Sequence, residues 1–181
     1  MIIGLFFGSF NPIHNGHIDI SNEVIHKSDI DKVWMVLSPQ SPHKKEVLDK
    51  NIRLELMKVA LSKHKNISVS TIEFDMPIPN YTCNTLKKLS IEFPSLRFKI
   101  IMGDDNYKKL KEWKDYKYII SNFEIIVYPR NELSHKSIFS EKIFNISSSK
   151  IRSNIRNKKC ISDYLPVEVE KKIIDYKLYF K

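Results

Sequence analysis

Two histidines, His14 and His17, stand three positions apart in the segment Gly8–His17, and Gly16 lies between them. If a helix begins there, this spacing lets both imidazole rings face one ligand, and the glycine leaves room for it. Free N–H groups at a helix start attract phosphate, and imidazole donors can stabilise charge that develops on a phosphoryl group. The alternatives are a simple capping pair or a metal pair, which would want a third protein ligand that the segment does not visibly offer. The pattern favours a phosphate site.

A second polar segment, Ile146–Arg152, lies far along the chain. Ser148 and Ser149 would stand at a helix start, where hydroxyls and free N–H groups can donate to phosphate oxygens. Arg152 adds a planar fork that can bind phosphate through two hydrogen bonds. Taken alone, the serines could be a plain helix cap. Beside the histidine pair, the segment could help to clamp a triphosphate.

Apolar strand-like runs alternate with helical patterns along the chain, and these elements must position the polar segments. Short β-branched or aromatic runs, typical of buried strands, occupy residues 2–7, 33–37, 97–102 and 123–128, with a weaker candidate at 67–72. Apolar spacings of three and four predict helices around residues 52–60 and 86–93, and further helices are expected at 15–25, near 151–155 and after Pro166. This order predicts a single α/β domain over residues 1–181, a Rossmann-like, doubly wound, mostly parallel sheet with helices on both faces.

Ligands of such a sheet bind beyond the carboxyl ends of its strands. Three of the four glycines, Gly8, Gly16 and Gly103, lie in segments that follow predicted strands, where a backbone must come close to a ligand. Neither the dinucleotide fingerprint GxGxxG nor the Walker loop is present. The sequence therefore disfavours a classical dehydrogenase and a P-loop NTPase.

The composition is that of a globular protein, with 42% hydrophobic and 28% charged residues. No apolar stretch is long enough for a membrane span, and the first residues lack the features of a secretory signal, so we expect a cytoplasmic protein. Cys83 and Cys160 show no metal-ligand or disulfide pattern and are expected to be reduced. The net charge of +9 suits small phosphorylated substrates, and the scattered lysines make nucleic-acid binding the less favoured interpretation.

Several motifs resemble a known family. The segments GSFNPIHNGH and ISSSKIR resemble the two signatures of the H-x-G-H nucleotidyltransferase superfamily. Within it, four further segments resemble the bacterial nicotinate (nicotinamide) mononucleotide adenylyltransferases: Pro42-His43-Lys44, Pro79–Leu86, Gly103-Asp104-Asp105 with Trp113, and Tyr164-Leu165-Pro166.

The resemblance implies a set of site residues. The mononucleotide would contact Ser9, Phe10, Lys44, Tyr81, Thr82, Thr85 and Trp113, with Trp113 stacked on the pyridine ring. ATP would contact Gly8, Ser9, His14, His17, Gly103, Asp105, Ser148, Ser149 and Arg152. The catalytic groups would be His14, His17, Lys44 and Arg152. From the residues alone, Trp113 could pack in the core, but its place in the polar stretch 111–117 favours a position facing a ligand, and Asp105 could equally cap a helix or accept ribose hydroxyls.

The implied reaction joins nicotinate mononucleotide to the AMP part of ATP, with Mg²⁺ brought by the ATP phosphates and no protein metal site. The chain departs from the common family pattern at Phe7, Ser9 and Asn11, and Lys114 follows Trp113 where an aromatic residue is frequent. The alternatives are another member of the superfamily, such as a phosphopantetheine adenylyltransferase, and a non-catalytic basic module that binds nucleic acid. The polar segment 131–145 is expected to be a mobile surface loop, with a functional lid as the less favoured alternative.

Overall fold

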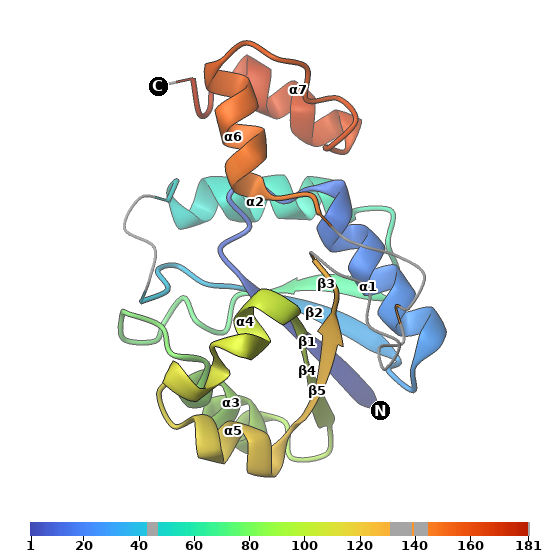
Figure 1. Cartoon of the computed structure of the whole chain (residues 1–181), viewed down its shortest axis with the longest axis vertical. Coiled ribbons are helices and arrows are strands. Elements are labelled where there is room, and N and C mark those ends of the chain that lie inside the picture. The colour runs from blue at the N-terminus through green and yellow to red at the C-terminus, as the bar shows by residue number, and fades with distance from the viewer. Residues whose placement is uncertain (43–46, 131–138, 140–144, 181) are drawn as a thin grey trace.

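Five parallel strands form the centre of the molecule (Figure 1). The computed structural model describes residues 1–42, 47–130, 139 and 145–180. The sheet order is β3-β2-β1-β4-β5, with β1 between the two halves. The strands are β1 (Ile2–Gly8), β2 (Lys32–Leu37), β3 (Ile67–Ser70), β4 (Arg97–Gly103) and β5 (Glu124–Tyr128). From β1 the chain adds strands first on one side, β2 and β3, and then on the other, β4 and β5. A crevice is expected at this switch point, at the carboxyl ends of β1 and β4.

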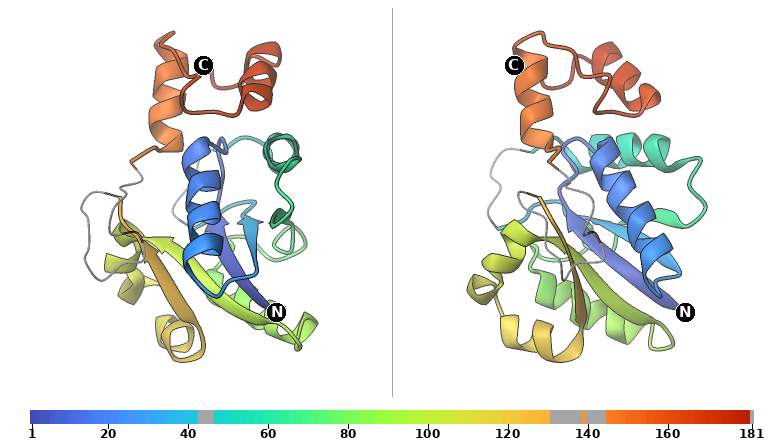
Figure 2. Two further views of the ribbon diagram at one scale, coloured as in Figure 1. Left: turned by 90° about the vertical axis from the view of Figure 1, so that its right-hand side faces the viewer. Right: turned by 45° about the vertical axis from the view of Figure 1, so that its right-hand side comes forward.

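Helices cover both faces of this sheet, as Figures 1 and 2 show. One side carries α1 (Asn15–Lys27) and α2 (Lys50–Leu61), with α6 (Ser148–Arg156) and α7 (Val167–Asp175) beyond them. The other side carries α3 (Thr82–Glu92) and α5 (Tyr116–Asn122), while α4 (Asp104–Lys108) and the 3₁₀ helix η1 (Leu110–Glu112) follow β4.

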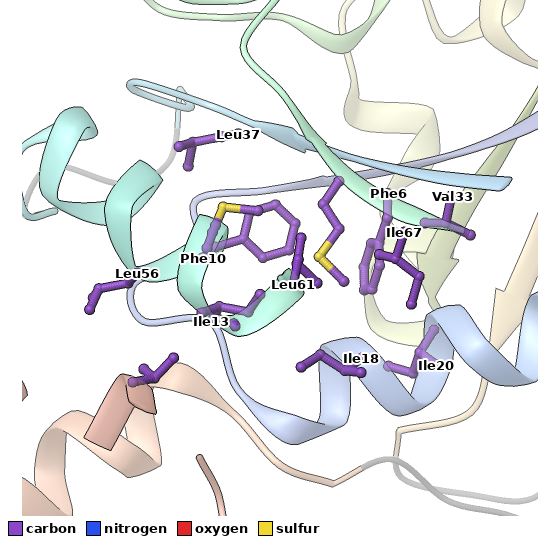
Figure 3. Packing of buried hydrophobic residues seen from close by; sticks show 14 of the residues in the cluster. Phe6, Phe10, Ile13, Ile18, Ile20, Val33, Leu37, Leu56, Leu61 and Ile67 are labelled. Carbon is purple, nitrogen blue, oxygen red and sulfur yellow. The ribbon is translucent and has the colours of Figure 1, made fainter. Parts of the chain in front are cut away.

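The alternation of side chains along β1 divides the core into two layers. Ile2 and Phe6 belong to the cluster under α1 and α2, part of which is drawn in Figure 3. Ile3 and Leu5 point the other way and pack with α3, in a second cluster that includes Leu86. Because a large aliphatic side chain contributes about 1.5–3 kcal/mol when it is fully buried, both layers hold the central strand in register. The end of β1 is thereby fixed in space.

The predicted fold class is confirmed, and every predicted strand is present. The predicted helices are present too, although Phe93 caps α3 rather than lying inside it. Sequence patterns gave no sign of α4, η1 and α5, because these helices are short and only Leu110 and Ile119 among their residues are buried. Cys83 and Cys160 are free thiols, as expected.

The described parts of the chain contain no helix both long and apolar enough to cross a bilayer. Most of the predicted surface loop 131–145, namely residues 131–138 and 140–144, lies outside the described residues.

Candidate active site

The histidine pair lies at the start of α1, directly after β1. His14 is the residue before the helix, and its backbone N–H donates to Nδ1 of His17 at 3.2 Å. The two rings stack with their centroids 3.6 Å apart, and the ring of Phe10 meets that of His17 edge to face. The helix start therefore presents both imidazoles as one rigid unit.

His14 is buried in an unusual state. Only 1% of the residue is exposed, and neither ring nitrogen has a hydrogen-bond partner among the described residues. Burial, together with the positive charge of Arg130, lowers the pKa of His14 from about 6.5 to about 3. The ring is therefore neutral at physiological pH, with unsatisfied polar atoms that a ligand could engage.

The turn between β1 and α1 brings the backbone close to this pair. Phe10 adopts a left-handed conformation with φ of 43°, and its ring folds back over Gly8. A Cβ added at Gly8 would lie 3.0 Å from that ring, so glycine is needed there.

The start of α6 is fastened to the same turn. Ser147 caps the helix by accepting from the backbone N–H of Lys150, and the Ser148 hydroxyl donates to the carbonyl of Pro12 at 2.8 Å. Arg152 donates through Nη1 to the carbonyl of Asn11 at 2.7 Å and through Nη2 to Ser149 Oγ at 3.3 Å. Two segments far apart in the sequence thus meet as one cationic, hydroxyl-rich wall.

A further cation, Arg130, follows β5 and was not identified from the sequence. Its Nη1 donates to Asp105 Oδ2 and its Nη2 to the carbonyl of Ile146, both at 3.2 Å. Asp105 is therefore engaged by an arginine, and a Cβ at Gly103 would come within 2.5 Å of its Oδ1. The only sequence signal for Arg130 was its position after a predicted strand, at the edge where ligands bind.

These elements enclose a cavity of about 380 Å³ at the carboxyl edge of the sheet. Its lining includes the predicted phosphate-binding residues and Arg130: Gly8, Ser9, His14, His17, Gly103, Arg130, Ser148, Ser149 and Arg152. Asp105 does not line it but lies behind Arg130. Two arginines, hydroxyl donors and a helix start converge here, and together they can bind a polyphosphate.

A second cavity of about 480 Å³ adjoins the first and shares five of its lining residues: Phe7, Gly8, Ser9, Asn106 and Trp113. Tyr81 and Thr82 line it from the start of α3, and Lys114 lines it from the loop before α5. Trp113 is half-buried and faces both cavities. The lining is suited to an aromatic ring joined to a phosphate.

Comparison with known proteins agrees with this arrangement. The family model described as "Cytidylyltransferase-like" matches residues 5–154. A protein of Flavobacterium psychrophilum named "Probable nicotinate-nucleotide adenylyltransferase" is 46% identical over 100% of both chains. One with the same name from Cytophaga hutchinsonii is 37% identical, over 99% of this chain and 98% of its own. The chain belongs to the cytidylyltransferase-like family, in its nicotinate-nucleotide adenylyltransferase branch.

The fold is also that of a solved adenylyltransferase. The Plasmodium falciparum nicotinic acid mononucleotide adenylyltransferase complexed with NaAD superposes with a TM-score of 0.77 at 19% identity. The alignment covers 98% of this chain and 97% of that chain.

Two residues assigned to the mononucleotide by resemblance to the adenylyltransferases, Thr85 and Phe10, do not line the second cavity. Thr85 lines neither cavity; it is fully buried, and its hydroxyl donates to Glu73 Oε1 at 2.7 Å. Phe10 lines the first cavity and not the second. Lys44 lies outside the described residues, so its role stays a prediction.

Glu73 itself lines the second cavity and was missed, because nothing in its sequence surroundings distinguishes it. Burial raises the pKa of its carboxyl, which is 2% exposed. Thr85 therefore holds the carboxyl group of Glu73 in place, in the wall of the second cavity of this adenylyltransferase.

Arg53 of α2, like Arg130 and Glu73, was not identified from the sequence. Its guanidinium is fully buried and donates to the carbonyls of Ser9, Ser38, Pro39 and Leu48 at 2.7 to 2.8 Å. In this member of the family, one side chain thereby ties together the loops that follow β1 and β2.

Proposed function

We propose that this protein joins nicotinate mononucleotide to the AMP moiety of ATP, giving deamido-NAD and pyrophosphate. The observation that carries the proposal is the pair of adjoining cavities, which share Gly8, Ser9 and Trp113. One is lined by phosphate-binding groups and the other by aromatic rings, so the two substrates would meet at the shared wall. The family to which the chain belongs supports the same reaction.

The reaction is a direct in-line attack by the mononucleotide phosphate on the α-phosphorus of ATP. The nucleophile is already an anion, so no general base is needed, and catalysis depends on positioning and charge stabilisation. His14 and His17 face the transferring phosphoryl group, while Arg130, Arg152 and the α6 serines neutralise the pyrophosphate as it leaves.

Mg²⁺ is proposed to arrive bridging the ATP phosphates and to supply further charge neutralisation there. Among the described residues no three His, Cys, Asp or Glu side chains lie together in a way that could hold a metal. We propose that the protein binds the phosphates of Mg-ATP and that the ion keeps several of its waters.

The acceptor is proposed to be a pyridine mononucleotide. Tyr81 precedes α3 and makes no side-chain capping bond, so the helix start at Thr82 can offer backbone N–H groups to a carboxylate. Trp113 offers its ring for stacking. A phosphopantetheine arm would have no use for these groups. Since the thiols are free, we place the protein in a reducing compartment, the cytoplasm.

Pyrophosphate release by the purified protein tests the proposal. Mg-ATP is supplied with nicotinate mononucleotide, nicotinamide mononucleotide or phosphopantetheine in separate reactions. Turnover chiefly with nicotinate mononucleotide is expected. Preference for phosphopantetheine would keep the mechanism and overturn the acceptor, whereas no turnover from folded protein, with salt-sensitive RNA binding, would favour the nucleic-acid module.

A further inference from the structure

Lys114 is a cation in the wall of the second cavity and has no place in the mechanism above. It lines this cavity and not the first, where Arg130 and Arg152 lie. Its Nζ stands 4.7 Å from the centroid of the Tyr81 ring, beside the start of α3. A positive charge is thus held at the aromatic end of the site, away from the phosphate-binding end.

The charges around Lys114 leave it available to a ligand. Asp115, its neighbour in the chain, is paired with Lys87 at 2.9 Å. In the described part of the chain no ion pair joins Lys114 to a carboxylate. Glu73 lies in the same wall, but burial raises its pKa and so favours its neutral form.

Among the described residues, Glu112 is the remaining charged group that lines this cavity, and it is exposed on η1. Its negative charge would oppose an anionic ring substituent rather than attract one. It therefore offers a matched comparison with Lys114, because both side chains line the same cavity from neighbouring positions and carry opposite charges.

We propose that the Lys114 ammonium pairs with the carboxylate on the pyridine ring of nicotinate mononucleotide and so favours the acid over the amide. The inference rests on the proposed function and adds a residue that sets specificity. Lys114 would thus add a side-chain charge to the recognition of the carboxylate by the backbone N–H groups at the start of α3. The phosphate is common to both mononucleotides, and only the carboxylate differs.

The test compares kcat/KM for nicotinate and nicotinamide mononucleotides in Lys114→Gln, Lys114→Arg and the control Glu112→Gln. The ratio of acid to amide is expected to fall about tenfold or more in Lys114→Gln, through the acid alone, since a hydrogen bond to a charged group contributes about this much. Lys114→Arg should keep most of the ratio, and Glu112→Gln should not lower it.

An unchanged ratio in Lys114→Gln would overturn the proposal, as would an equal loss for both substrates, which would point to the phosphate or to structure. Calorimetric binding of each mononucleotide to the same variants gives a second measurement that does not need turnover. If the wild-type protein releases no pyrophosphate, the proposed function fails, while the binding ratio still decides the role of Lys114.

Discussion

At the scale of single residues, burial of His14 makes the stability of the fold depend on pH. Its ring is buried beside Arg130, and its pKa is lowered to about 3. Between that value and the ordinary pKa of about 6.5, the unfolded chain binds a proton that the folded protein does not. Stability therefore rises with pH through this window and is unaffected by His14 above it.

The free energy of unfolding should accordingly fall by about 1.36 kcal/mol for each pH unit below about 6.5 on account of His14. His14→Gln should lose this slope, measured by urea unfolding between about pH 5 and 6.5, where ordinary carboxylates have mostly titrated. His26→Gln, which changes an exposed histidine of α1, is the control and should keep the slope. Equal slopes in the wild type and His14→Gln would contradict the burial argument.

His17 faces the cavity from the first turn of α1, where its ring is held between Phe10 and His14. Because it is expected to donate to the transferring phosphoryl group, His17→Ala should lower kcat by about 10²–10³. Folding should remain intact, which circular dichroism and thermal unfolding can verify. A folded variant with near-normal kcat would remove His17 from the mechanism.

At the scale of elements, the loops after β1 and β2 are held by one buried side chain of α2. Arg53 donates to four carbonyls that accept no backbone N–H from any described residue in the turns and loops. Arg53→Met keeps much of the volume but leaves these carbonyls without donors, so unfolding should become easier by about 2–4 kcal/mol. Denaturant unfolding measures this effect.

The matching control is Arg156→Met, which removes an exposed arginine from the end of α6 and should change stability by about 0.5 kcal/mol or less. If Arg53→Met were equally mild, the loops would be held by other contacts. KM values of the Arg53 variant are expected to rise as well, since Ser9 lines both cavities.

The sequence predicted the elements whose signal is local. The strands were found because their apolar runs are short and continuous, and β3 ends two residues before its predicted limit because only Ile67 of its four residues is buried. The helices between β4 and β5 were missed because they bury few side chains.

The residues of the candidate site also fall into two groups, those that local sequence predicts and those that it does not. His14, His17, Ser148 and Arg152 belong to compact motifs, so their types and spacing could be interpreted directly. Arg53 contacts carbonyl oxygens 5 to 44 positions away, and Arg130 pairs with Asp105 from 25 positions away. Contacts between a side chain and a distant backbone leave no periodic pattern, so these residues become visible only when the sheet brings the loops together.

At the scale of the whole molecule, the net charge of +9 acts on substrates that are all anions. The carboxyl edge of the sheet collects Arg130 and Arg152 at one cavity and Lys114 at the other. Such a field raises the local concentration of anionic ligands before any contact is made. The distribution therefore favours capture of both substrates at one edge.

Salt should weaken this capture. Raising KCl from about 0.01 M to about 0.1 M shortens the Debye length from about 30 Å to about 10 Å, so kcat/KM for the mononucleotide should fall about threefold or more. The value of kcat should change less, because the groups that line the cavities are screened less than those on the outer surface. A neutral solute at equal osmolarity, with Mg-ATP held constant, is the control. The kcat/KM of nicotinamide mononucleotide, which carries one negative charge fewer, should fall less than that of nicotinate mononucleotide. If salt changed neither value, only short-range contacts would govern binding.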